Sequence, residues 1–194
     1  MITGRDLLRE EITRVWDIDR SEVIHNIYYF EQGGLVLKPE YYNMTGWPPG
    51  EADLYTPILM RAFDRGAWFY GLFEDGTLIA VVILDNKFIG RRADLLQLKF
   101  LHVSSAYRGQ GLGVRLFDLA KARALAQGAK GLYISATPSE NTIDFYLQRG
   151  SVVTPDPDPE LFELEPEDIH LECEIAGGCY EDRSAGSGLY MAFI

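Results

Sequence analysis

Residues 100–113 have the sequence FLHVSSAYRGQGLG, and this stretch decides the fold. Its apolar start predicts a strand that ends at Val103, and three glycines then open an amphipathic helix that runs to about Gln127. The first turn of a helix presents amide N–H groups without partners and the positive end of the helix dipole. The stretch therefore predicts a phosphate or diphosphate site with Arg108 at its rim, the alternative being a strand–helix turn that needs glycine only for packing.

Two common nucleotide motifs do not fit these glycines. A P-loop ends in Gly-Lys-Ser/Thr, but no lysine follows Gln110 in the sequence Gly111-Leu112-Gly113. A dinucleotide-binding fingerprint has its third glycine three residues after the second, where this chain has Val114. A nucleotide-binding protein of another type is therefore kept only as an alternative.

Strand and helix patterns alternate on both sides of this stretch. Asp75-Gly76 is a strong turn signal and predicts a hairpin, and residues 31–34 predict a second turn between strands. The expected strands are 24–30, 35–37, 67–73, 78–84, 93–103, 131–136 and 169–175; the expected helices are 4–14, 51–64 and 139–148, beside the helix that follows the glycines; loops are expected at 46–50 and 155–159. This order predicts a mixed α/β sheet of the α+β kind.

The length of 194 residues is typical of one domain, and we expect a single domain over 1–194. The pattern gives no structure for the C-terminal extension, 176–194. The longest apolar run, 78–84, is far shorter than the roughly 18 residues that cross a membrane, so no membrane partner is expected. The first nine residues contain no apolar signal segment, from which we expect a cytoplasmic protein.

Acidic residues outnumber basic ones, 29 to 18, which gives a net charge of -11. Phosphate neutralisation needs a basic stripe, so no nucleic-acid partner is expected. The charge favours a cationic small molecule or a basic peptide as partner, although a generic acidic surface explains it equally well.

The cysteine and histidine pattern predicts neither a disulfide framework nor a metal. Cys173 and Cys179 are the two cysteines, and we expect both to be reduced. A zinc site needs four ligands at recognisable spacing, which the cysteines and the scattered His25, His102 and His170 do not supply.

Two motifs in order carry a family resemblance. The first is Arg108-x-x-Gly111-x-Gly113, and the second, on the next expected helix, is Asn141-x-x-x-Phe145-Tyr146-x-x-x-Gly150. Together they resemble the signatures of the GNAT-type N-acetyltransferases, which use acetyl-CoA. The strand order extends the resemblance, and thus an N-acetyltransferase core, over about residues 20–175. The family usually has Gly-Phe where this chain has Gly150-Ser151, a mild departure.

The resemblance implies a mostly antiparallel sheet flanked by helices, in which the strand ending at Val103 and the strand 131–136 are parallel and splay apart. The pantetheine arm of acetyl-CoA would lie in that gap along main-chain groups of Leu101 and Val103. The main-chain N–H near Val103 would polarise the thioester carbonyl. The cofactor-binding residues that the resemblance implies are Leu101, His102, Val103, Arg108, Gly109, Gln110, Gly111, Leu112, Gly113 and Asn141.

Tyr146 stands where the family has the general acid that protonates the departing thiolate. A phenol with a reference pKa of about 10 is a suitable donor to a thiolate whose reference pKa is about 8.5. The alternative is an aromatic side chain that packs beside Phe145.

The base that takes the amine's proton is not identified by the sequence. Some relatives have a glutamate six residues before the valine, where this chain has Gln97, which cannot act as a base. We expect the side chain of His102 to pack on the strand face that carries Leu98 and Phe100, rather than to act as a base. The other candidates are water, Glu31, Glu51, Asp53, Asp85 and Asp94.

The family builds its acceptor pocket largely from the N-terminal half, which is aromatic in this chain. Aromatic faces there would hold an organic cation, although ordinary packing explains each residue as well. The residues concerned are Tyr28, Tyr29, Phe30, Tyr41, Tyr42 and Trp47.

The expected function is an acyltransferase that moves the acetyl group of acetyl-CoA to a primary amine of a small molecule or peptide by direct attack. The alternative is a non-catalytic module that binds CoA or acyl-CoA, which the loss of the acidic residue at Gln97 allows and Tyr146 argues against. A homodimer is a further expectation, because an edge strand needs covering and the apolar residues 189–194 are available for it.

Overall fold

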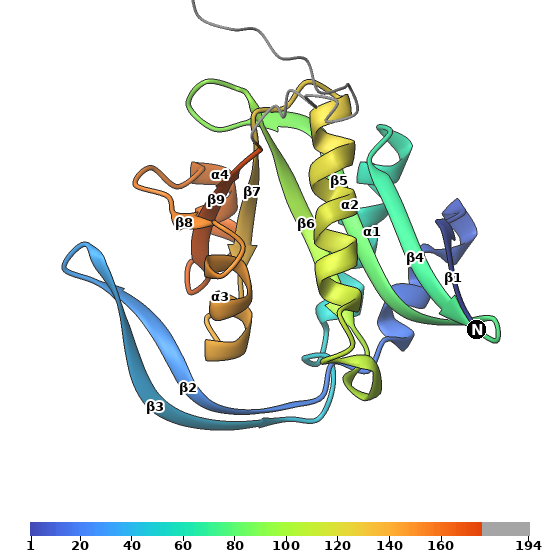
Figure 1. The fold of residues 1–194 in the computed structure, drawn as a ribbon, viewed down its shortest axis with the longest axis horizontal. Helices are drawn as coiled ribbons and strands as arrows, with labels where there is room; N and C mark the ends of the chain where they lie inside the picture. The colour runs from blue at the N-terminus through green and yellow to red at the C-terminus, as the bar shows by residue number, and fades with distance from the viewer. Residues whose placement is uncertain (176–194) are drawn as a thin grey trace, which may run out of the picture.

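The computed structural model describes residues 1–175, so Cys179 and the expectations for 176–194 lie outside the described residues. Seven strands form one sheet in the order β1-β4-β5-β6-β7-β9-β8 (Figure 1). Neighbouring strands are antiparallel except β6 and β7, which are parallel. This architecture confirms the predicted fold class. The strands are β1 (Ile2–Asp6), β4 (Trp68–Glu74), β5 (Thr77–Ile89), β6 (Leu95–Val103), β7 (Gly131–Ala136), β8 (Val152–Val153) and β9 (Ile169–Glu174).

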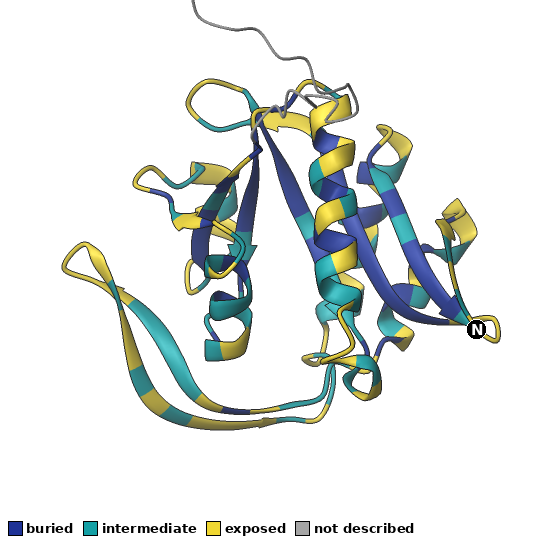
Figure 2. Ribbon diagram, viewed as in Figure 1, coloured by how far each residue is buried: buried dark blue, intermediate teal, exposed yellow. Residues whose placement is uncertain are grey.

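Helices cover both faces of the sheet, and each face has its own core. Helices α2 (Leu112–Ala126) and α3 (Glu140–Leu147) pack on one face, and α1 (Glu51–Asp64) and the 3-10 helix η1 (Arg9–Asp17) pack on the other. From Ala80 to Leu84 the side chains of β5 alternate between these two cores, as the pleat requires. Figure 2 accordingly shows the central strands as mostly buried between the helices.

A hairpin of β2 (Glu22–Glu31) and β3 (Gly34–Met44) stands apart from this sheet. It confirms the predicted strand–turn–strand, with longer strands than expected. In Figure 1 it curves past the end of the sheet where β6 and β7 lie apart. The Tyr28 amide donates to the Pro138 oxygen at 2.8 Å and its hydroxyl donates to Asp144 at 2.9 Å, so the hairpin is joined to α3.

The hairpin of β4 and β5 and the helix at 51–64 confirm the predictions for those segments. The expected helix at 4–14 is wrong, because Ile2–Asp6 pairs with the free edge of β4 and the 3-10 helix begins only at Arg9. Backbone pairing with a strand that is distant in sequence overrides the helical spacing of the apolar residues.

The loop predicted at 155–159 ends one residue early. Pro159 is the first residue of α4 (Pro159–Leu164), and the side chain of Asp158 caps this helix by accepting from the amides of Glu160 and Leu161 at 3.1 and 3.2 Å. Proline is favoured at the first helical position because its missing N–H would have no partner there.

The parallel strands β6 and β7 pair only over their first residues. Leu95–Gln97 pairs with Gly131–Tyr133, and beyond this point the two strands separate, as Figure 1 shows. The gap that opens between them is the predicted splay. It lies beside the N-terminal ends of α2, the helix before β7, and α3, the first helix after β7.

A β-bulge at Lys99 changes which residues of β6 share a face. Phe100 pairs with Ile83 but Leu98 pairs with Leu84, so Lys99 has no partner on β5. Leu98 consequently packs in the core under α2, whereas Phe100 packs in the core under α1. The prediction that Leu98 shares a face with Phe100 is therefore wrong.

Candidate active site

A cavity of about 820 Å³ occupies the gap between β6 and β7 and extends between the hairpin, α1 and α3. It is lined by Tyr146 and by all the predicted cofactor-binding residues except Gln110. The side chain of Gln110 is exposed and donates to the Ala106 oxygen at 3.2 Å instead. The fold thus brings the two sequence motifs to one cavity.

The glycine turn before α2 presents several free amides to this cavity. Gly109 and Gly111 have φ angles of +72° and +79°, and Gly111 is the N-cap of α2. No protein acceptor within residues 1–175 meets the N–H groups of Gly109, Gln110 or Gly111, and the next three amides belong to the first helical turn. This turn fits the diphosphate of a CoA ester, because its N–H groups and the helix dipole favour an anion.

Gly113 serves a different purpose from the other two glycines. A Cβ atom built there would lie 3.3 Å from the ring of Phe145, whereas one at Gly109 or Gly111 would meet nothing within 4 Å. Gly113 therefore allows α2 and α3 to pack closely, while Gly109 and Gly111 allow the left-handed backbone of the turn.

Leu101 and Val103 direct main-chain groups into the gap. Ser104 donates its amide to the Ile79 oxygen at 2.9 Å, just outside the paired residues Ala80 and Val103. Hydrogen-bonded and non-hydrogen-bonded pairs alternate along an antiparallel ladder. Because Ser104 is hydrogen-bonded to Ile79, the neighbouring pair of Val103 and Ala80 is a non-hydrogen-bonded one, and the N–H and C=O of Val103 point away from β5. The same holds two residues earlier at Leu101. An extended chain that lies in the gap can therefore pair with this edge of β6.

Arg108 and Asn141 meet the same acidic side chain at the rim. The Asn141 amide donates to Glu22 at 2.9 Å, and the Arg108 guanidinium lies 3.7 Å from the other carboxylate oxygen. Arg108 also donates to the main-chain oxygens of Val103 and Ser21, at 3.1 and 3.0 Å. The first residues of β2 thus complete this end of the cavity, which the sequence motifs did not indicate.

His102 packs between aromatic rings, as expected. Its ring centroid lies 4.8 Å from that of Trp47 and 5.3 Å from that of Phe100. Burial, with smaller effects from the charges of Arg20 and Arg108, lowers the pKa of His102 to about 3. The imidazole is therefore neutral at physiological pH and too weakly basic to take a proton from an ammonium group.

Tyr146 is 6% exposed, packs edge-on against Phe117 and Phe145, and is one of the residues that line the cavity. Burial, and to a lesser extent the charge of Asp168, raises the pKa of Tyr146, so the phenol stays protonated across the neutral range. Among residues 1–175, no side chain or main-chain group is hydrogen-bonded to this hydroxyl.

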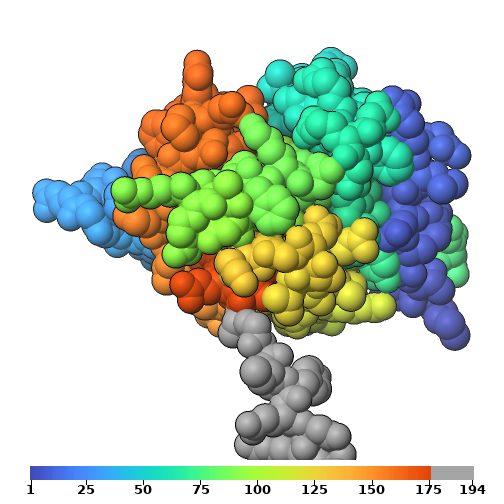
Figure 3. Space-filling view, turned by 90° about the horizontal axis from the view of Figure 1, so that it is seen from above, coloured from blue at the N-terminus to red at the C-terminus, as the bar shows by residue number. Residues whose placement is uncertain are grey.

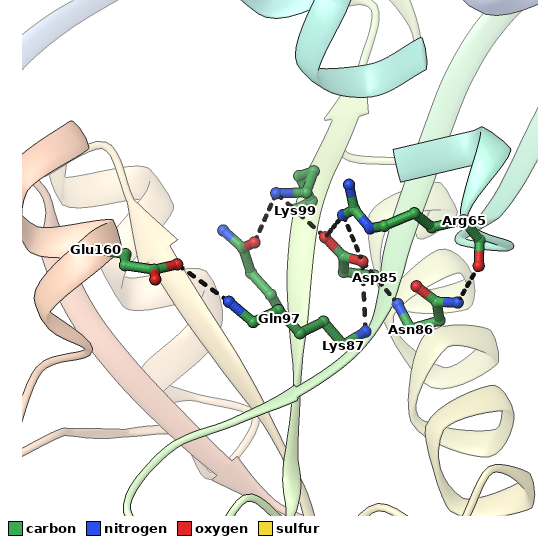
Figure 4. Close-up of polar contacts among 7 residues, drawn as sticks. All are labelled: Arg65, Asp85, Asn86, Lys87, Gln97, Lys99 and Glu160. Atoms are coloured by element: carbon green, nitrogen blue, oxygen red, sulfur yellow. Dashed lines mark hydrogen bonds and ion pairs between the residues drawn. The ribbon is translucent and has the colours of Figure 1, made fainter. Parts of the chain in front are cut away.

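Gln97 is held in a buried polar network, which Figure 4 shows. Its side-chain oxygen accepts from Lys99 at 2.7 Å, and the Lys99 ammonium lies 3.4 Å from Asp85. Arg65, at the end of α1, pairs with the same carboxylate at 3.3 Å. Asp85 is therefore neutralised from two sides, and the network serves to hold β5, β6 and α1 together.

The same network connects to α4 at the surface. Lys87 and Glu160 form an ion pair at 3.0 Å, which joins the last part of β5 to α4. Seen from above in Figure 3, the end of β5 and the loop after it (green) lie beside the segment that contains α4 (orange).

Of the five carboxylates considered as bases, only Glu51 lines the cavity. Glu31 pairs with Lys38 in the turn of the hairpin, and Asp94 pairs with Arg92 at 3.0 Å near the start of β6. Asp53 is exposed on α1, and Asp85 belongs to the network described above. Sequence reasoning missed three acidic residues that do line the cavity, namely Glu22, Glu165 and Asp168.

The predicted aromatic pocket is not assembled, since none of its six residues lines the cavity. Tyr29 and Tyr42 bind Glu40 on the hairpin, and Trp47 packs against Trp16 in the core under α1. The cavity instead receives Tyr55 of α1, whose hydroxyl donates to Glu165 at 2.7 Å.

The splayed strands, the glycine turn and the buried tyrosine define a CoA-dependent acyltransferase architecture. The chain belongs to the acetyltransferase (GNAT) family, whose model matches residues 26–150. GNAT enzymes are acyltransferases that use acetyl-CoA as co-substrate. A comparison with curated proteins gives no significant match.

Solved structures of low sequence identity share the fold. Nourseothricin acetyltransferase is 15% identical with a TM-score of 0.63, and the match covers 90% of this chain and 98% of that one. A protein from Bacillus anthracis str. Ames, in complex with acetyl coenzyme A, is 16% identical with a TM-score of 0.66 over 90% and 98% of the two chains. The ribosomal-protein-S18-alanine N-acetyltransferase from Escherichia coli is 16% identical with a TM-score of 0.58 over 98% and 100%.

Within the described part of the chain, no helix is both long and apolar enough to cross a membrane. Residues 1–175 also contain no group of three or more histidine, cysteine, aspartate or glutamate side chains placed to hold a metal ion.

Proposed function

We propose that this enzyme transfers the acetyl group of acetyl-CoA to a primary amine of a small molecule or peptide by direct attack. One observation carries the proposal: the free amides of the glycine turn, the open edge of β6 and the side chain of Tyr146 belong to residues that line one cavity. A diphosphate held at the turn leaves room for an extended arm along β6 that ends near Tyr146.

In this proposal the amides of residues 109–113 and the side chain of Arg108 bind the diphosphate. The main-chain groups of Leu101 and Val103 pair with the pantetheine arm, and Asn141 steadies it. The Val103 N–H, which points away from β5, donates to the thioester oxygen, where negative charge develops during attack.

Tyr146 is the proposed general acid. Its pKa, raised chiefly by burial, keeps the proton on the phenol until the thiolate departs. Because no group of residues 1–175 is hydrogen-bonded to this hydroxyl, it is free to turn toward the leaving sulfur. Direct attack also agrees with the position of Cys173, which is buried in β9 and does not line the cavity.

The acceptor end of the cavity supports a cationic amine. Glu51 is balanced by Arg20 at 3.1 Å. Within residues 1–175, Glu165 accepts from the uncharged Tyr55 hydroxyl and forms no ion pair, and Asp168 beside it forms none either. These two carboxylates favour an ammonium group there, in keeping with the net charge of -11.

The test incubates the enzyme with acetyl-CoA and a panel of amines: propylamine, spermidine, an aminoglycoside and a basic tetrapeptide with a free amino terminus. Thiol release and the mass gain of one acetyl group on the amine are measured together. We expect both with at least one cationic amine. Binding of CoA without thiol release for any amine would instead establish the non-catalytic CoA-binding alternative.

A further inference from the structure

Four carboxylates from residues 1–175 line the cavity, and they differ in the bonds that they form. Glu22 accepts from Asn141, Glu51 is paired with Arg20, and Glu165 accepts from Tyr55. The carboxylate of the fourth, Asp168, forms no hydrogen bond or ion pair with any other residue of the described range 1–175. It is half-buried in the cavity that Tyr146 lines.

The position of Asp168 is fixed by its neighbours in the fold. It directly precedes β9, whose first residue, Ile169, pairs with Ala136 at the end of β7 where the gap is widest. Its amide donates to the Glu165 oxygen at 3.2 Å. That oxygen also lies 3.3 Å from the buried ring of His170, so the turn from 165 to 168 is held from two sides.

The anchor of this turn continues into the sheet. The other ring nitrogen of His170 lies 2.8 Å from the Tyr133 hydroxyl, which accepts from the Asp158 amide at 2.9 Å. A buried chain of hydrogen bonds therefore ties the turn to β7 and to the start of α4. The polar groups around Asp168 are thus hydrogen-bonded to one another, while its own carboxylate has no such bond within residues 1–175.

We propose that Asp168 is the proton acceptor of the reaction, opposite the proton donor Tyr146. Asp168 takes one proton from the substrate ammonium, which frees the nitrogen lone pair to form the C–N bond. As the C–S bond breaks, the sulfur takes the proton of Tyr146, and the proton that nitrogen then sheds restores the phenol. Asp168 returns its own proton to water, so that an ammonium and a thioester give an amide, a thiol and one proton.

The electrostatic surroundings of Asp168 suit this role. Burial raises its pKa to about 7, with further increases from the charges of Glu165, Glu51 and Glu167, while Arg20 opposes them. The groups that face it are thus Arg20 before β2, Glu51 and Tyr55 of α1, Tyr146 of α3, and the acids at 165 and 167. A base with a pKa near the working pH is efficient because it both takes and releases protons readily.

The other groups near the cavity are less suitable. Gln97 has no basic atom, and burial leaves His102 too weakly basic. Proton acceptance by Glu51 would break its pair with Arg20, in which both side chains are largely buried. Asp168, in contrast to Glu51, can accept a proton without breaking a hydrogen bond or ion pair to another residue of the described range.

This inference rests on the proposed function, and its test compares Asp168→Asn with Glu167→Gln. The control removes an exposed carboxylate one residue away that does not line the cavity and contributes least to the raised pKa of Asp168. The dependence of kcat/KM on pH is measured with the amine panel described above and with hydroxylamine, which is mostly uncharged at neutral pH. Asp168→Glu is included as a conservative variant, and unfolding and CoA binding are measured for all variants.

We expect kcat/KM of the wild type and of Glu167→Gln to rise with pH up to about 7, as Asp168 loses its proton. Asp168→Asn should lower kcat/KM for the ammonium substrates about 100- to 1,000-fold, and its pH profile should lack this ascending limb. For hydroxylamine, the same substitution should lower kcat/KM far less. Asp168→Glu should recover part of the rate. If the folded Asp168→Asn variant kept the pH profile and the rate of the wild type, the role of Asp168 would be overturned while the proposed function stood. If the wild type transferred no acetyl group to any amine, the proposed function itself would be overturned.

Discussion

The Nε–H of Arg108 donates to the main-chain oxygen of Val103 at 3.1 Å, so the arginine of the phosphate site touches the strand edge proposed for pantetheine. The same guanidinium lies 3.7 Å from Glu22, the first residue of β2. An acidic side chain therefore competes with a diphosphate for Arg108. The start of the hairpin thereby reaches the cofactor end of the cavity.

Glu22→Gln should tighten binding of acetyl-CoA about two- to five-fold, because it removes a negative charge beside the diphosphate and weakens a partly exposed ion pair. Titration calorimetry at low ionic strength measures the effect, which should shrink as salt is added. Glu31→Gln makes the same change of charge in the hairpin turn, far from the cavity, and should leave the affinity unchanged. Weaker binding by the Glu22 variant would show that this carboxylate positions Asn141 and Arg108 instead.

The glycines of the turn make a second prediction. Gly111→Ala should destabilise the protein by about 1–2 kcal/mol, because an alanine at φ +79° is strained, and it should weaken acetyl-CoA binding. Gly33→Ala, at φ +83° in the hairpin turn, carries a similar strain and also meets open space. Urea unfolding should show similar losses for the two variants, with an altered CoA dissociation constant only for Gly111→Ala. Equal affinities in both would remove the turn from the phosphate site.

Tyr146→Phe separates catalysis from packing. The variant should lower turnover about 100- to 1,000-fold, with CoA affinity and stability nearly unchanged, because the hydroxyl has no partner within the described residues. Tyr133→Phe offers the contrast, since that hydroxyl binds both His170 and the Asp158 amide and its loss should reduce stability. Steady-state kinetics and thermal unfolding distinguish the two. Unaltered turnover after the Tyr146→Phe change would leave Tyr146 as a packing residue only.

The sequence predicts well those features of the fold that depend on residues close together in the chain. The glycine turn, the helix after it and the turn at Asp75-Gly76 depend on local backbone preferences, and each was found where expected. The two motifs meet in space because each stands at the start of a helix beside β6 or β7. Their place in the cavity therefore followed from order and spacing alone.

Apart from the start of α4, which local capping decides, the misses depend on contacts between segments far apart in the chain. Residues 2–6 become a strand only because β4 has a free edge, and the bulge at Lys99 is a property of the pairing between β5 and β6. Glu165 and Asp168 reach the cavity because β9 returns antiparallel to β7. A carboxylate that follows a short helix has no local feature to mark it as part of a site.

Asp168 also connects activity with stability. Its pKa is raised from 3.8 to about 7 in the folded protein, so between these values the folded state holds a proton that the unfolded state has lost. Stability should therefore fall as the pH rises through this window and level off above about pH 7. Deprotonation leaves a half-buried negative charge with no ion-pair partner among residues 1–175, and this charge destabilises the folded protein at neutral pH.

Asp168→Asn should accordingly raise the free energy of unfolding at pH 8 by roughly 1–3 kcal/mol while lowering activity, and the gain should disappear near pH 4. Denaturant unfolding at several pH values measures this difference, with Glu167→Gln expected to follow the wild type. Greater stability with lower activity is the pattern of a residue kept for chemistry, because a structural carboxylate would destabilise the protein when removed. An Asn variant less stable than the wild type at pH 8 would contradict both the raised pKa and the unpartnered state of Asp168.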